Sequence, residues 1–189
     1  MRKTALIGLA VLATAAFAII GANGKTGGAS SGLQPGEFCP AFEPTHVSGP
    51  DGGTNTCPVC KYGARPAVQI WLAPDAKDQA AKFATALEPA VTAHKDKDMK
   101  AFIVMMTMCD SCVQAATKIG KADPNKDVAI VHLATDNEAI KNYKINTSKD
   151  VKNTVMVYKD RKVVKSFVNL TPDKEGLAKL SAAIEEVTK

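Results

Sequence analysis

Four of the five cysteines of this 189-residue chain form two C-x-x-C pairs. Cys57 and Cys60 lie in the segment CPVC, and Cys109 and Cys112 lie in CDSC. Two thiols at this spacing can close to a disulfide, exchange it with another thiol, or bind a soft metal ion. A bridge over two intervening residues closes a very small loop and constrains the unfolded chain only weakly. The spacing therefore favours redox or metal chemistry, and a non-catalytic domain with structural disulfides is the remaining alternative.

Metal binding is the main alternative to redox exchange. Met108 directly precedes Cys109, and thioether and thiolate sulfurs together favour Cu(I). The two pairs could also supply the four thiolates of a tetrahedral zinc site, although Cys60 and Cys109 are much further apart than the pairs of a zinc ribbon. Copper or zinc, bound by Met108 and the paired cysteines, is thus the alternative cofactor, whereas thiol–disulfide exchange needs none. The remaining cysteine, Cys39, is interpreted as a small buried apolar residue.

The N-terminus has the pattern of a secretory signal peptide. Arg2 and Lys3 precede an uncharged apolar run from Ala5 to Ile20, and small polar residues follow it. We predict a signal peptide at residues 1–22, a flexible Gly- and Ser-rich tether at 23–35, and one folded domain at 36–189. Export would place the protein in the periplasm or outside the cell, where disulfides persist. Membrane attachment is expected only if this leader remains uncleaved.

Composition and charge argue against nucleic-acid binding. The formal net charge is +5, and two of the positive charges lie in the leader, so the chain is not basic enough to indicate nucleic-acid binding. With 46% hydrophobic and 23% charged residues, the chain resembles an ordinary folded domain. The expected partners are instead protein thiols or a redox partner protein.

The elements that must position the cysteines alternate between strands and helices. The predicted strands are Ala67–Leu72, Ala101–Met106, Val128–Ala134, Thr154–Tyr158 and Val163–Val168. The first three are apolar almost throughout, which is typical of parallel strands covered on both faces. The last two are joined by a short turn, which predicts an antiparallel hairpin.

Helices are predicted between these strands and at the end of the chain. Their expected ranges and caps are 76–94 after Asp75, 111–120 after Asp110, 138–143 after Asp136, and a terminal helix after Thr171 and Pro172. The resulting fold class is α/β, with a mostly parallel central sheet, a C-terminal antiparallel hairpin and flanking helices.

This order of elements resembles the thioredoxin-like fold, and three short segments carry the same resemblance. GEFCPAF, at residues 36–42, is similar to the entry segment of peroxiredoxins and membrane-anchored thioredoxin-like proteins. The stretch from residue 142 through the terminal helix resembles the ββα half of thioredoxin. CPVCKYGARP resembles the C-x-x-C-x-Y-G-x-R-P segment of small exported thioredoxin-like proteins. The resemblance implies a thioredoxin-like domain and thiol–disulfide exchange.

Two placements of the reactive site compete. In thioredoxin families the reactive pair follows a central strand and opens a helix, where the helix N-terminus stabilises a thiolate. If residues 101–106 form that strand, Cys109 is the attacking thiolate and Cys112 the resolving one. Asn153 then occupies the position of the family's cis-proline, and Asp110 disfavours a neighbouring thiolate by its charge.

If residues 67–72 form the central strand, as GEFCPAF favours, the usual active site falls near Ala73, Pro74 and Asp75 and contains no cysteine. Cys57 and Cys60 then lie before the central strand, outside the usual catalytic place. Both pairs remain candidates on either placement, so the candidate catalytic residues are Cys57, Cys60, Cys109 and Cys112.

Overall fold

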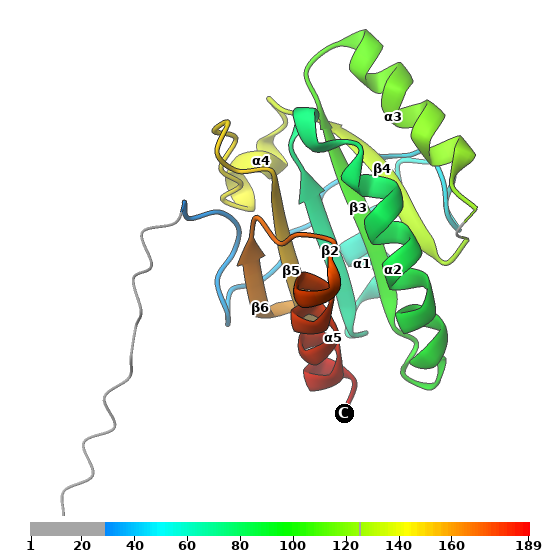
Figure 1. Cartoon of the computed structure of the whole chain (residues 1–189), viewed down its shortest axis with the longest axis vertical. Coiled ribbons are helices and arrows are strands. Elements are labelled where there is room, and N and C mark those ends of the chain that lie inside the picture. The colour runs from blue at the N-terminus through cyan, green and yellow to red at the C-terminus, as the bar shows by residue number, and fades with distance from the viewer. Residues whose placement is uncertain (1–28, 125) are drawn as a thin grey trace, which may run out of the picture.

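The computed structural model describes residues 29–124 and 126–189 (Figure 1). The predicted signal peptide at residues 1–22 lies outside the described residues. The strands are β1 (Thr45–His46), β2 (Ala67–Leu72), β3 (Lys100–Thr107), β4 (Val128–Ala134), β5 (Asn153–Lys159) and β6 (Lys162–Val168). The helices are α1 (Pro58–Tyr62), α2 (Gln79–Ala93), α3 (Asp110–Ala122), α4 (Glu138–Asn142) and α5 (Lys174–Thr188), with 3-10 turns η1 (Pro74–Ala76) and η2 (Lys95–Lys97). None of the described helices is long and apolar enough to span a membrane.

The six described strands form one sheet in the order β1-β4-β3-β2-β5-β6. Strands β2, β3 and β4 are parallel, whereas β1 pairs antiparallel with β4, β5 with β2, and β6 with β5. Only two of the five neighbouring pairs among these strands are therefore parallel, and the expectation of a mostly parallel sheet is wrong. An apolar run indicates that a strand is buried on both faces, but it does not indicate the direction of the strand. Strand β5 is almost as buried as β2, although it runs antiparallel to it.

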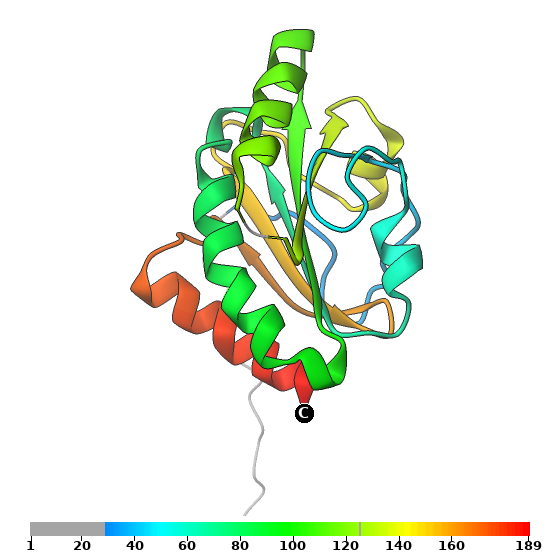
Figure 2. The same cartoon turned by 90° about the vertical axis from the view of Figure 1, so that its right-hand side faces the viewer.

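Helices cover both faces of the sheet (Figure 2). One core cluster contains residues of α1 and α4 with alternate residues of the strands, including Trp71 and Phe102. The other contains residues of α2, α3 and α5 with the intervening strand residues, including Ile70 and Ile103. This alternation is the period of two expected for side chains along a strand. Every residue of β2 is buried because the two cores meet at this strand.

Several helix starts differ from the predicted ones. The side chain of Asn137, not Asp136, caps α4 by accepting the amide of Ala139 at 2.9 Å. Asp173 caps α5 in the same way through Gly176, so the predicted start at Thr171 and Pro172 is wrong. Asp75 lies in η1 and does not cap α2, which begins only at Gln79. The mismatches at α4 and α5 arise because neighbouring residues also have cap-forming side chains, and the tertiary path of the chain selects one of them.

The last residues of the predicted tether at 23–35 pack against the sheet. Ser31 and Leu33 are buried, and the hydroxyl of Ser31 lies 2.6 Å from that of Thr154 on β5. The amide of Gly32 donates to the carbonyl of Lys144 at 2.9 Å. A Cβ at Gly32 would lie 2.5 Å from the methyl group of Thr154. Small residues, which we associate with flexibility, serve here to let the backbone lie close to the sheet.

The segment that follows is anchored by an aromatic cluster. Phe42 is 6% exposed, and its ring centroid lies 5.2 Å from that of Trp71 and 5.3 Å from that of Tyr143. The hydroxyl of Tyr143 donates to the carbonyl of Pro40 at 2.6 Å. These contacts fix residues 40–42 against the face of the sheet that also carries α1 and α4.

Phe42→Ala should lower the free energy of unfolding by about 3–5 kcal/mol, because truncation leaves a cavity among buried rings. Phe38 is the matched control, because it is 52% exposed. Among the described residues, the guanidinium of Arg161 is the one aromatic or cationic group that stacks on its ring. Phe38→Ala should cost about 1 kcal/mol or less. Urea unfolding of both variants measures the difference, and equal losses would contradict the anchoring role of Phe42.

Candidate functional site

Cys109 and Cys112 form a disulfide at the start of α3, with their Cα atoms 5.1 Å apart. Cys109 is the N-cap residue of this 13-residue helix, and its carbonyl accepts the amide of Cys112 at 2.9 Å. Cys109 is exposed and Cys112 is partly buried. One sulfur is therefore open to an incoming thiol, and the positive end of a helix dipole lies beside it.

The surroundings of this pair combine apolar, polar and acidic groups. The side chain of Met108 is 69% exposed directly before Cys109. The hydroxyl of Ser111 lies 3.2 Å from the sulfur of Cys109. Asp110, in the first turn of α3, is also exposed, so solvent screens its opposition to a thiolate. The helix N-terminus and the hydroxyl thus favour a thiolate at Cys109, while Asp110 opposes it.

Cys57 and Cys60 form the second disulfide, with their Cα atoms 5.3 Å apart, at the start of α1. The sulfur of Cys57 accepts the amide of Cys60 at 3.1 Å. Cys57 packs against the core cluster that contains α1 and α4, whereas Cys60 is exposed. The two cysteines therefore differ in their exposure to solvent: Cys60 is the more open to an incoming thiol, and Cys57 is partly buried.

A cleft of about 420 Å³ lies beside the Cys57–Cys60 disulfide. Its walls come from three parts of the chain: the entry segment, α1 and α4. The lining residues are Ala41, Phe42, Glu43, Cys57, Cys60, Asn137, Glu138, Ala139 and Asn142. Sequence analysis did not find this cleft, because residues 41–43 and 137–142 are far apart in the chain and have no shared motif.

The two pairs belong to helices on opposite faces of the sheet. Val59 of α1 packs in one core cluster, and Ala116 of α3 packs in the other. Within residues 29–124 and 126–189, no group of three or more His, Cys, Asp or Glu side chains is arranged to hold a metal ion. The four paired cysteines are thus two separate sites and do not form one four-thiolate cluster.

The carboxyl end of β2 corresponds to the second of the two expected placements. The hairpin strand β5 pairs with β2, and Asn153 lies opposite Leu72. Ala73, Pro74 and Asp75 follow β2 directly, and none of them is a cysteine. The Cys109–Cys112 pair instead follows β3, the neighbouring parallel strand.

Polar side chains close this end of β2. Asn153 is 2% exposed, and its amide donates to the side-chain oxygen of Gln79 at 2.8 Å and to the carbonyl of Leu170 at 2.9 Å. Its side-chain oxygen accepts the amide of Leu170 at 2.9 Å. No described peptide bond is cis. Beside Asn153, an ion pair with Lys152 lowers the pKa of Asp75. Asn153 therefore links β5, α2 and the chain before α5, which a proline at this position could not do.

Cys39 does not join either pair. It is completely buried, and its sulfur accepts the side-chain amide of Gln69 at 3.3 Å. Burial raises the pKa of the Cys39 thiol to about 12. A thiol in this environment is neutral and inaccessible, consistent with a packing role.

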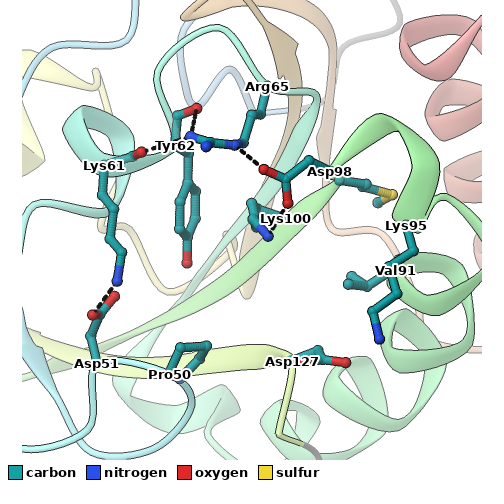
Figure 3. Close-up of a pocket in the computed structure, with 11 residues that line it drawn as sticks. Pro50, Asp51, Lys61, Tyr62, Arg65, Val91, Lys95, Asp98, Lys100 and Asp127 are labelled. Atoms are coloured by element: carbon teal, nitrogen blue, oxygen red, sulfur yellow. Dashed lines mark hydrogen bonds and ion pairs between the residues drawn. The ribbon is translucent and has the colours of Figure 1, made fainter.

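A second cavity, of about 330 Å³, lies at the amino ends of β3 and β4 (Figure 3). Ion pairs line this cavity: Lys61 pairs with Asp51, and Asp98 pairs with both Arg65 and Lys100. The guanidinium of Arg65 also donates to the carbonyls of Lys61 and Tyr62, the last residues of α1, at 3.0 and 3.1 Å. The cavity contains no cysteine, and its charged wall fixes the C-terminal end of α1. The short helix that carries the Cys57–Cys60 disulfide is thereby anchored at its C-terminal end.

Comparison with known proteins identifies solved structures with a similar fold. No family model and no curated protein matches the sequence. The fold is similar to a putative thiol:disulfide interchange protein DsbE from Chlorobium tepidum (TM-score 0.63, 13% identity, 83% of this chain and 99% of that one). It is also similar to a putative protein disulfide isomerase from Bacteroides thetaiotaomicron (TM-score 0.59, 16% identity, 85% of this chain and 94% of that one). A third similar structure is peroxiredoxin Q from Xanthomonas campestris (TM-score 0.55, 11% identity, 85% of this chain and 100% of that one). The chain therefore has a thioredoxin-like fold.

Asn153→Ala should lower the free energy of unfolding by about 1–3 kcal/mol, because it leaves the buried backbone groups of Leu170 without partners. It should leave the redox equilibrium of Cys109 and Cys112 unchanged, since Asn153 lies beside β2 and the pair follows β3. Chemical denaturation measures the first quantity, and alkylation with mass spectrometry in glutathione buffers measures the second. A shifted redox equilibrium in a stably folded variant would contradict a purely structural role.

Proposed function

We propose that this protein is an exported thiol–disulfide exchange protein that acts on protein thiols or on a redox partner protein. One observation carries the proposal: two C-x-x-C pairs at disulfide distance, each with an exposed cysteine, on a thioredoxin-like fold. Thiol–disulfide neighbours in the structural comparison support this class of chemistry. No cofactor is needed, because the two thiols of each pair carry the two electrons.

Cys109 and Cys112 would perform the exchange at the end of β3. In the reduced protein, the Cys109 thiolate attacks a substrate disulfide, and one substrate sulfur leaves as a thiolate. Cys112 then attacks the sulfur of Cys109 in the mixed disulfide, which releases the second substrate thiolate and closes the protein disulfide. Two electrons pass to the substrate, and the protons of Cys109 and Cys112 end on its two thiols. The exposure of Cys109 and its N-cap position suit it to the first step.

The displaced position of this pair changes how a substrate would be held. The polar closure around Asn153 occupies the end of β2, so a substrate would have to bind further along the sheet. Met108, exposed beside Cys109, offers an apolar contact there. Val113 and the residues one turn further along α3 line a shallow hollow that a polypeptide segment could cover. We expect extended, weakly sequence-selective binding at this site.

Export supports the same chemistry. The uncharged run from Ala5 to Ile20 has the length and flanks of a signal peptide. In the periplasm or outside the cell, both disulfides would form readily and persist until a partner reduces them. The oxidised state of both pairs in the structure is the state expected there.

Removing the reactive pair tests the proposal. Cys109→Ser with Cys112→Ser should slow the dithiothreitol-dependent reduction of insulin by at least about tenfold, because the assay depends on the attacking thiolate. Lys174→Ala, at an exposed position on α5 outside the hollow of α3, is the control and should retain the wild-type rate. An unchanged rate without Cys109 and Cys112, or cysteines that keep one oxidation state across a glutathione redox series, would overturn the role of this pair.

A second candidate function is Cu(I) binding, and the exposure of Met108 beside the Cys109–Cys112 pair favours it. In the reduced protein, two thiolates and one thioether would be available to a soft cation. Native mass spectrometry of the reduced protein after anaerobic loading should show one bound Cu(I), and Met108→Leu should weaken its retention against a competing chelator. An unchanged mass with copper would exclude this function, and a gain of zinc alone would replace it with the zinc alternative.

A further inference from the structure

The cleft beside the Cys57–Cys60 disulfide is a formed site with a reactive group in its wall. Both cysteines line the cleft of about 420 Å³, and Cys60 is the exposed one. Phe42 and Ala139, which are 6% and 3% exposed, form an apolar floor. The aromatic cluster around Phe42 and the Arg65 contacts at the end of α1 hold two of its walls in place. The cleft is large enough for a side chain and the adjoining backbone of a bound peptide.

The charged residues that line this cleft are both acidic. Glu43 lies on the entry segment and Glu138 opens α4, and both are exposed. Neither carboxylate forms an ion pair with another described residue. Lys61 follows Cys60 directly but is paired with Asp51 and lines the other cavity. The lining of this cleft therefore contains two carboxylates and no cation, which favours cationic ligands.

We propose that this cleft binds polypeptide segments in which Arg or Lys flanks a cysteine, and that the Cys57–Cys60 pair exchanges selectively with such thiols. The inference rests on the proposed exchange function and adds a class of substrate to it. The acidic side chains recognise the flanking cations, while Phe42 and Ala139 contact the apolar parts of the segment.

The unequal access of the two sulfurs sets the order of bond changes. A substrate thiolate attacks the exposed sulfur of Cys60, the Cys57–Cys60 bond breaks, and Cys57 leaves as a thiolate. The amide of Cys60 already donates to the Cys57 sulfur at 3.1 Å, which stabilises the developing charge. A second substrate thiolate then attacks the substrate sulfur of the mixed disulfide and releases Cys60. Two substrate thiols become one disulfide, and their two protons end on Cys57 and Cys60.

The other pair provides a contrast within the same molecule. The hollow next to Cys112 is lined by Val113, Gln114, Thr117, Lys118, Lys121 and Ala122, and its charges are positive. A preference for cationic substrates is therefore expected of Cys57 and Cys60 and not of Cys109 and Cys112. Because α1 and α3 pack on opposite faces of the sheet, one variant can remove either site without altering the surface of the other.

The experiment uses the protein with Cys109→Ser and Cys112→Ser, which retains the Cys57–Cys60 disulfide. Two peptides, Gly-Arg-Cys-Arg-Gly and Gly-Glu-Cys-Glu-Gly, serve in turn as the thiol that reduces this disulfide. Alkylation and mass spectrometry measure the rate of reduction with each peptide. Each rate is divided by the rate at which the same peptide reduces hydroxyethyl disulfide, a neutral reagent. This correction removes the difference in intrinsic thiol reactivity between the two peptides. The corrected ratio should favour the arginine peptide by about tenfold or more at low ionic strength and fall as salt is added.

Removing the two carboxylates should abolish this preference. Glu43→Gln with Glu138→Gln should bring the corrected ratio close to one, while Glu175→Gln, at an exposed position of α5, should leave it unchanged. The protein with Cys57→Ser and Cys60→Ser, which keeps the other pair, should show no preference for the arginine peptide. Because the Glu-to-Gln changes are on the surface, circular dichroism should show an intact fold.

The possible failures are distinguishable. Equal corrected rates for the two peptides, with normal reduction of Cys57–Cys60, would overturn the inferred substrate class and leave the exchange function standing. A preference that survives Glu43→Gln with Glu138→Gln would overturn the assignment to this cleft. A Cys57–Cys60 disulfide that neither peptide reduces would overturn exchange at this pair, whatever the behaviour of Cys109 and Cys112.

Discussion

The burial of β2 on both faces is the constraint on which the remaining structure depends. All six of its residues are buried, and the strand pairs with β3 on one side and with β5 on the other. Each face needs an apolar cover, which α1 and α4 supply on one side and α2, α3 and α5 on the other (Figure 2). Both cysteine pairs lie at the starts of covering helices, so their positions follow from the way this strand is enclosed.

The same C-x-x-C spacing has two different environments in this fold. At α3 the disulfide is on a protruding helix start with an exposed methionine, and the helix is long enough for its dipole to act on Cys109. At α1 the helix has five residues, Cys57 is held against the core, and the disulfide lines an acidic cleft. The identical spacing allows a local bridge in each pair, whereas the surroundings determine which cysteine is exposed and which charges lie near it.

The end of β2 is closed by polar side chains and holds no cysteine. Asn153 satisfies both backbone groups of Leu170 and one side chain of α2, so the position has become a hydrogen-bonded junction. A buried junction of this kind is stable only when every polar group has a partner. The neighbouring strand β3 offers an equivalent helix start at the same edge of the sheet, and the Cys109–Cys112 pair is found there.

The sequence by itself determined five of the six described strands, because apolar runs such as 67–72 and 128–134 require burial whatever their partners. It did not indicate the two-residue strand β1, which forms only by pairing with β4. It also identified the two cysteine pairs, since their spacing permits a local bridge. It did not determine the direction of β5, the packing of Ser31 and Leu33, or the choice of Asp173 as a helix cap, which depend on contacts with distant residues. Only the tertiary structure placed Glu43 and Glu138 beside Cys60, because electrostatic fields act through space and local sequence patterns do not record which distant segments become neighbours.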